Sequence, residues 1–158
     1  MEEDLLKHVA QRLVRFGPPV SRSEIDEAER LTGCRFPSLL SEVYLRVGAG
    51  AIAHVPHHLR RPSVVASDYV RHRGSEVNGW KWPECLLPVA DWGCGIQACV
   101  LATTDDAELW WFDPNLDGGE PPEYMAPPWP TGMPLDEWMR GFVNGDEFLQ
   151  HWPPNQRP

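Results

Sequence analysis

The sequence predicts a single α+β domain in which an antiparallel sheet packs against N-terminal helices and a C-terminal helix. Three observations support this class: helix-like patterns fill the first 50 residues, strand-like runs fill residues 86–112, and another helical pattern follows at 135–143. Helices first, strands in the middle and a helix last are typical of α+β proteins. The chain has 158 residues, 42% of them hydrophobic, which suits one domain with a full core.

The first helix is indicated by apolar residues at helical spacing. Leu5, Val9, Leu13 and Phe16 follow this pattern, and the Gly-Pro-Pro sequence at 17–19 ends it. We therefore expect one amphipathic helix from the N-terminus to about residue 16.

The second and third helices are marked by their ends. Ser21 and Glu24 form a capping box for the second helix, and Gly33 ends it. Pro37 suits the first turn of the third helix, which the glycines at 48 and 50 end. The residues expected to face the core are Ile25, Ala28, Leu31, Leu40, Val43, Tyr44 and Val47.

Periodicity is weak from residue 51 to 83, the one basic stretch of the chain, and we expect a surface excursion there. Ser67 could cap a short helix within it. Strands are expected over 86–90, 96–103 and 108–112, the last two joined by a hairpin turn at 104–107. Residues 114–134 are rich in proline and glycine and predict a long loop, and a final amphipathic helix begins at Leu135 and ends at Gly145.

Composition excludes several classes of protein. No apolar run approaches the ~20 residues of a membrane span, and the first residues lack the order of a signal peptide, so we expect a cytoplasmic protein. Four cysteines at irregular spacing do not suit a disulfide-rich secreted scaffold, and we interpret them as reduced and mostly buried.

The charge is acidic and unevenly distributed. The net charge is −9; residues 1–73 carry 11 Lys/Arg against 9 Asp/Glu, and residues 74–158 carry 3 against 14, giving +2 and −11. An acidic surface repels nucleic acid and favours basic proteins, so a basic protein is the expected partner. The alternative is that the acidic part only aids solubility.

No metal site is expected. Asp113, Asn115 and Asp117 match the first half of a calcium loop, but Tyr124 stands where the bidentate Glu belongs, so an Asx-type turn is preferred. The histidines at 54, 57 and 58 lack further ligands at zinc spacing, and Cys94 and Cys99 straddle the start of a strand. We therefore predict no cofactor.

No catalytic site is expected either. The chain lacks a nucleophile elbow, a phosphate-binding loop, a dinucleotide motif and a zinc-protease motif. Cys94 has no base beside it to activate the thiol, and the neighbouring Asp91 carboxylate disfavours a thiolate. Asp105 and Asp106 are interpreted as turn residues without a pocket context. These absences favour a non-enzymatic protein.

Eight tryptophans favour recognition of another protein. In a strand, Trp110 and Trp111 must point to opposite faces of the sheet, so one packs in the core. The other needs either a partner or a covering loop, and the sequence leaves both open.

The order of motifs from about Ser21 to Glu147 resembles the SUKH superfamily, which includes regulators of fungal cell-wall synthesis and many bacterial proteins. Its parts are the helix at 21–33 with Phe36-Pro37 and the helix to Gly50, then LPVADWGCG at 87–95, then Phe112-Asp113-Pro114 with the closing helix. The chain departs from the family pattern at Ser38, at 48–50 and in the 51–83 segment, expected to be a variable insert.

This resemblance implies one non-catalytic domain over 1–158, with an N-terminal helix and linker at 1–20 and a flexible tail at 151–158. It also implies an immunity protein that neutralises a cognate toxin, a basic nuclease being the natural candidate. The alternative is a housekeeping regulatory or scaffolding domain. The residues expected to touch the partner are Asp91, Trp92, Trp111, Asp113, Asp117 and Trp129.

Overall fold

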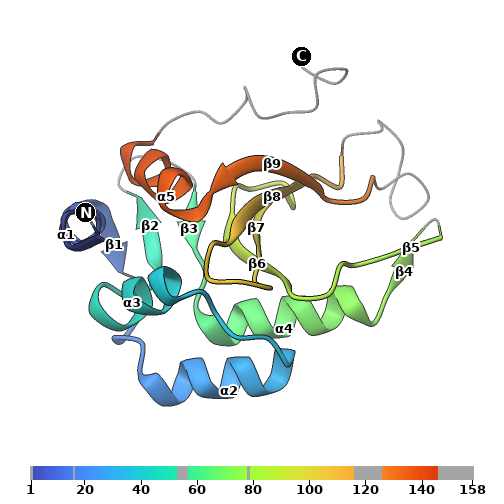
Figure 1. The fold of residues 1–158 in the computed structure, drawn as a ribbon, viewed down its shortest axis with the longest axis horizontal. Helices are drawn as coiled ribbons and strands as arrows, with labels where there is room; N and C mark the ends of the chain where they lie inside the picture. Colours follow the sequence, from blue (N-terminus) through green and yellow to red (C-terminus); the bar gives the residue numbers. More distant parts are fainter. Residues whose placement is uncertain (1, 16, 53–56, 78, 116–125, 146–158) are drawn as a thin grey trace.

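The computed structural model describes residues 2–15, 17–52, 57–77, 79–115 and 126–145, and Figure 1 shows their arrangement. Within these ranges, five helices and a seven-stranded antiparallel sheet form one α+β domain. The predicted fold class is therefore confirmed.

The main sheet runs in the order β1-β2-β3-β6-β7-β8-β9, and each neighbouring pair is antiparallel. Its strands are β1 (Leu13–Arg15), β2 (Gly50–Ile52), β3 (His58–Leu59), β6 (Leu86–Asp91), β7 (Gln97–Leu101), β8 (Glu108–Phe112) and β9 (Trp129–Pro134). A separate hairpin pairs β4 (Glu76–Val77) with β5 (Trp80–Lys81). The predicted hairpin of β7 and β8 is present, with Leu101 opposite Glu108.

The helices form two groups around the sheet, α4 with α2 and α1 with α3 and α5 (Figure 1). Helix α4 (Pro62–Arg73) lies against β6, and α2 (Arg22–Thr32) lies outside α4. Helix α1 (Glu2–Arg12) contacts both α3 (Ser38–Arg46) and α5 (Leu135–Asn144). None of the helices in the described ranges combines the length and apolarity needed to cross a bilayer.

The helix ends follow the capping chemistry that the sequence predicts. Ser21 Oγ accepts a hydrogen bond of 3.2 Å from the Glu24 N–H. Gly33 and Gly145 end α2 and α5 in the left-handed conformation that glycine adopts at little cost. The Glu24 carboxylate does not complete the capping box; it forms an ion pair with Arg61, the N-cap residue of α4, instead.

Two expectations about helices are wrong in detail. The first helix ends at Arg12, because Leu13–Arg15 pairs with β2 as an edge strand instead of continuing the helical pattern. On α2, Leu31 is 50% exposed, and the buried position belongs to Thr32, whose hydroxyl donates to the Ala28 carbonyl at 2.9 Å.

The expected surface excursion at 51–83 is also wrong, because most of the segment belongs to the core structure. It contains β2, β3 and α4, and the side chains of Val65, Ala66 and Tyr69 are buried. Pro62 at the start of α4 and the i, i+3, i+4, i+7 spacing from it are helix signals. Val64 and Val70 obscure them, since they place apolar residues on the exposed side.

The expected loop at 114–134 ends early, because Trp129–Pro134 forms strand β9 on β8. Two prolines fit here since β9 is an edge strand, where the outward side needs no N–H donor. Residues 116–125 lie outside the described ranges.

The expectation of four reduced cysteines is wrong for one pair. Cys34 and Cys85 form a disulfide with a Cα–Cα distance of 5.5 Å, joining the turn after α2 to the segment before β6. Cys99 is buried and Cys94 is exposed, both as free thiols. Spacing could not reveal the pair, because 51 residues separate its members.

Candidate protein-binding surfaces

Three of the predicted contact residues form an aromatic cluster on one face of the sheet. Trp111 on β8 lies opposite Trp129 on β9, and the Trp92 ring meets Trp111 edge-on at 4.9 Å between centroids. His57 stacks on Trp92 at 3.4 Å, and its burial lowers the pKa of the imidazole. Trp111 is only 3% exposed, whereas Trp92 and Trp129 are half-buried and reach the surface.

Trp110 lies on the other face of the sheet, opposite Cys99 and Pro130. It is half-buried, and its indole N–H has no hydrogen-bond partner among the described residues. The strand alternation therefore separates the two neighbouring tryptophans, and Trp111 is the one in the core.

Asp113 has a structural position, because only 3% of it is exposed. Its Oδ1 accepts hydrogen bonds from the Asn115 backbone at 2.8 Å and from Asn115 Nδ2 at 2.9 Å. The same Nδ2 donates to the Cys94 carbonyl at 2.8 Å. This is the predicted Asx-type turn, and it ties the end of β8 to the turn between β6 and β7. Asp117 lies outside the described residues.

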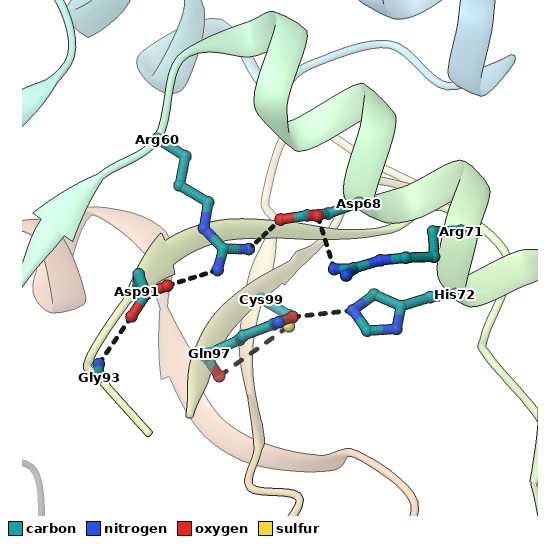
Figure 2. A network of polar contacts seen from close by, with 8 residues as sticks. All are labelled: Arg60, Asp68, Arg71, His72, Asp91, Gly93, Gln97 and Cys99. Carbon is teal, nitrogen blue, oxygen red and sulfur yellow. Dashed lines mark hydrogen bonds and ion pairs between the residues drawn. The ribbon is translucent and has the colours of Figure 1, made fainter. Parts of the chain in front are cut away.

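Asp91 belongs to a network of ion pairs under α4, shown in Figure 2. The buried Arg60 guanidinium donates to Asp91 at 2.7 Å and to Asp68 on α4 at 2.6 Å, and Arg71 donates to Asp68 at 2.6 Å. Burial acts to raise the pKa of Asp91, but hydrogen bonds from Arg60 and from the Gly93 N–H outweigh it and lower the pKa.

A second branch of Figure 2 joins α4 to β7, where His72 and Gln97 are hydrogen-bonded at 3.1 Å. The imidazole also stacks on Trp82 with 4.0 Å between centroids, and Trp82 Nε1 donates to the Leu86 carbonyl at 2.7 Å. Burial lowers the pKa of His72, which favours the neutral ring. The whole network holds α4 on the sheet, so we assign it a structural role.

Sequence reasoning missed a cavity of about 450 Å³ at the other end of the strands. Leu5, Leu39, Ala107 and Leu135 supply apolar walls, and the acidic side chains are Asp105, Asp106 and Asp136. The interpretation that the two turn aspartates lack a pocket context is therefore wrong. A second cavity of about 610 Å³ shares Ser38 and Asp105 with the first.

Only the turn residues could have pointed to this cavity from sequence. An acidic turn of this kind is usually explained by solubility, and the other walls come from segments far apart in the chain. Within the described residues, no group of three or more His, Cys, Asp or Glu side chains is placed to hold a metal ion.

The comparisons with known proteins place the chain in a family. No curated protein matches it in a sequence search. The family model described as SMI1 / KNR4 family (SUKH-1) matches residues 19–131, from the segment before α2 into β9. The match covers most of the 158 residues, and it spans the helix pair and the strands β6 to β8 that carried the resemblance, whereas the closing helix lies beyond it. The chain therefore belongs to the SMI1 / KNR4 family (SUKH-1).

Proposed function

We propose that this protein is a cytoplasmic bacterial immunity protein that binds and neutralises a cognate toxin without catalysis of its own. The observation that carries the proposal is family membership, since the SUKH superfamily is associated with immunity and regulatory binding. The charge supports a basic partner, because residues 74–158 carry 3 basic against 14 acidic residues. A basic nuclease toxin has the complementary charge.

The contact surface we propose centres on Trp92 and Trp129, the two half-buried tryptophans of the aromatic cluster. Both offer apolar area at the edge of the structure, Trp129 as the first residue of β9 and Trp92 directly after β6, and tryptophan is frequent at binding hot spots. The buried Trp111 ring packs edge-on against Trp92, and Asp113 stabilises the adjoining turn. Asp91 and Asp117 are the other two residues that we propose to contact the partner. The carboxylate of Asp91 is partly exposed.

Co-expression with the toxin encoded by a neighbouring gene tests the proposal. Wild-type protein should restore growth, and the purified pair should form a complex measurable by calorimetry. Trp92→Ser should weaken the complex by tenfold or more, because it removes an aromatic anchor. Trp80→Ser is the matched control, since Trp80 is also half-buried but lies in the separate β4–β5 hairpin and packs on Phe112.

Failure of protection would contradict the immunity role. Binding to an endogenous regulatory protein in that case would favour the housekeeping alternative. Equal weakening of the complex by both serine variants, with equal losses of melting temperature, would contradict the proposed contact surface but not the immunity role.

A further inference from the structure

The 450 Å³ cavity lies where four segments of the chain converge. Leu5 comes from α1, Leu39 from the first turn of α3, Asp106 from the β7–β8 turn and Leu135 from the start of α5. Because β7 and β8 run between this turn and the Trp92 region, the cavity lies at the opposite end of the sheet from the aromatic cluster. It is a separate surface.

The charges at this cavity are unbalanced. Asp105, Asp106 and Asp136 face a single cation, Arg140, which leaves a formal charge of −2. Asp105 is partly satisfied, since its Oδ1 accepts from the Ser38 N–H at 3.2 Å and thereby anchors the turn to the start of α3. In the described part of the chain, the side chains of Asp106, Asp136 and Arg140 form no hydrogen bond or ion pair.

We propose that this cavity is a docking groove for a segment of the partner protein that carries arginine or lysine beside apolar residues. A long basic side chain can lay its methylenes on Leu39 and Pro134 while its charged head reaches Asp106 and Asp136. Arginine suits the site best, because its planar fork pairs with carboxylates through two hydrogen bonds.

The neighbouring cavity indicates a chain segment as the occupant. The two cavities meet at Ser38 and Asp105, so their volumes of about 450 and 610 Å³ follow one another along the surface. Asp26 and Glu42 add carboxylates to the second cavity, where Arg22 and Arg35 are the cations. An extended segment can use both hollows, whereas a small ligand uses one.

This proposal rests on the proposed protein-binding function, but its test needs no toxin. A fluorescent peptide alternating arginine and leucine is titrated with the purified full chain, and its anisotropy is measured at 50 and 300 mM salt. The peptide should bind more weakly at high salt, because salt screens exposed charges. A peptide alternating arginine and serine should bind at least fivefold more weakly, because it lacks apolar side chains for the groove.

The decisive variant is Asp106→Lys/Asp136→Lys, which replaces two exposed carboxylates that have no described partner. It should weaken binding of the arginine-leucine peptide by tenfold or more at 50 mM salt. The matched control is Glu76→Lys/Glu84→Lys, which changes exposed acids elsewhere and moves the net charge equally, from −9 to −5. It should weaken binding less than twofold, and unchanged melting temperatures should show that both variants fold.

Three results would overturn the groove. They are equal weakening by the two variants, equal affinity for the arginine-serine peptide or for spermidine, and a wild-type dimer in sedimentation that Asp106→Lys/Asp136→Lys dissociates. The second result would show that the site binds cations without regard to apolar side chains. The third would show that the site is a surface through which the chain self-associates. If the toxin complex forms equally well with Asp106→Lys/Asp136→Lys, the docking groove is contradicted and the immunity role is not. If the protein fails to protect but still binds the arginine-leucine peptide, the immunity role is contradicted and the groove is not.

Discussion

At the scale of single residues, Arg60 shows how a polar side chain can anchor a helix to a sheet. Its side chain is 8% exposed and lies between Asp68 on α4 and Asp91 on β6. Taking a cation from water is costly, and two close carboxylates with short hydrogen bonds offset that cost. Removing the cation alone leaves two partly buried carboxylates near each other, with only the exposed Arg71 beside Asp68 and the Gly93 N–H beside Asp91.

We therefore expect Arg60→Met to lower the free energy of unfolding by about 3 kcal/mol, measured by urea denaturation at pH 7. Arg30→Met is the control, because Arg30 pairs with Glu27 on the exposed side of α2 and such surface pairs contribute about 0–1 kcal/mol. A loss of similar size in both variants would contradict the anchoring role of Arg60.

His72 gives a pH dependence whose sign follows from its lowered pKa. Burial holds the folded-state pKa below the ordinary value of 6.5, so the unfolded chain binds more protons in the interval between the two values. The contribution of the neutral His72 ring to the free energy of unfolding is fully present above pH 6.5, and it is lost as the pH decreases toward the folded-state pKa. Arg60 and Arg71 oppose protonation, whereas Asp68 and the Gln97 hydrogen bond favour it.

Urea denaturation at pH 7.5 and 5.5 measures this effect. Wild-type protein should lose stability at pH 5.5, and His72→Gln should lose less, because the variant has no imidazole to protonate at that position. The exposed His8→Gln variant should keep the wild-type difference. If His72→Gln loses as much as wild type, the pH dependence comes from other groups, of which His57 is one whose pKa burial also lowers.

At the scale of elements, local signals predicted well and long-range pairing did not. Ser21 and Gly33 bound α2 as expected, because capping depends on the nearest backbone groups. Leu13 continues a helical pattern, yet it lies in a strand opposite Ile52, a partner nearly 40 residues away. Periodicity cannot detect such a partner, and the same limit hid β3 and β9.

The β1–β2 pairing depends on Gly50. A Cβ atom at this position would lie 1.9 Å from the Val14 carbonyl oxygen, which belongs to the backbone and cannot move without separating the strands. Gly50→Ala should therefore lower the free energy of unfolding by about 2–4 kcal/mol in urea denaturation. Gly74→Ala at the end of α4, where the nearest atom would lie at 3.4 Å, should change it by less than about 1 kcal/mol. Equal effects would show that β1 does not approach this closely in solution.

At the scale of the whole molecule, the two candidate surfaces differ in how far the sequence could predict them. Trp92 and Trp129 are conspicuous because tryptophan is a frequent contact residue, and both do reach the surface. The groove is assembled from Leu5, Leu39, Asp106 and Leu135, which only the fold brings together. Composition did indicate the acidic character that both proposals use.

The disulfide also depends on the whole fold, since it joins two segments that approach each other across α4. Tyr69 on α4 lies between them, with its hydroxyl 3.7 Å from Cys34 Sγ and accepting a 3.1 Å hydrogen bond from the Cys85 N–H. Closing 51 residues of chain restricts the unfolded state, and a loop of this size contributes about 2–4 kcal/mol. In a reducing cytoplasm the pair would be two thiols, and the same chain would be less stable.

Thiol counting after denaturation tests this cross-link directly. Air-purified protein should react at two cysteines, Cys94 and Cys99, and protein denatured after reduction should react at four. Reduction should lower the melting temperature by about 5–15 °C, because about 2–4 kcal/mol is lost from a domain of this size. Cys34→Ser/Cys85→Ser should melt close to reduced wild type and should not respond to reductant, whereas Cys94→Ser should respond as wild type does. Four reactive thiols in air-purified protein would show that Cys34 and Cys85 are only neighbours in the fold.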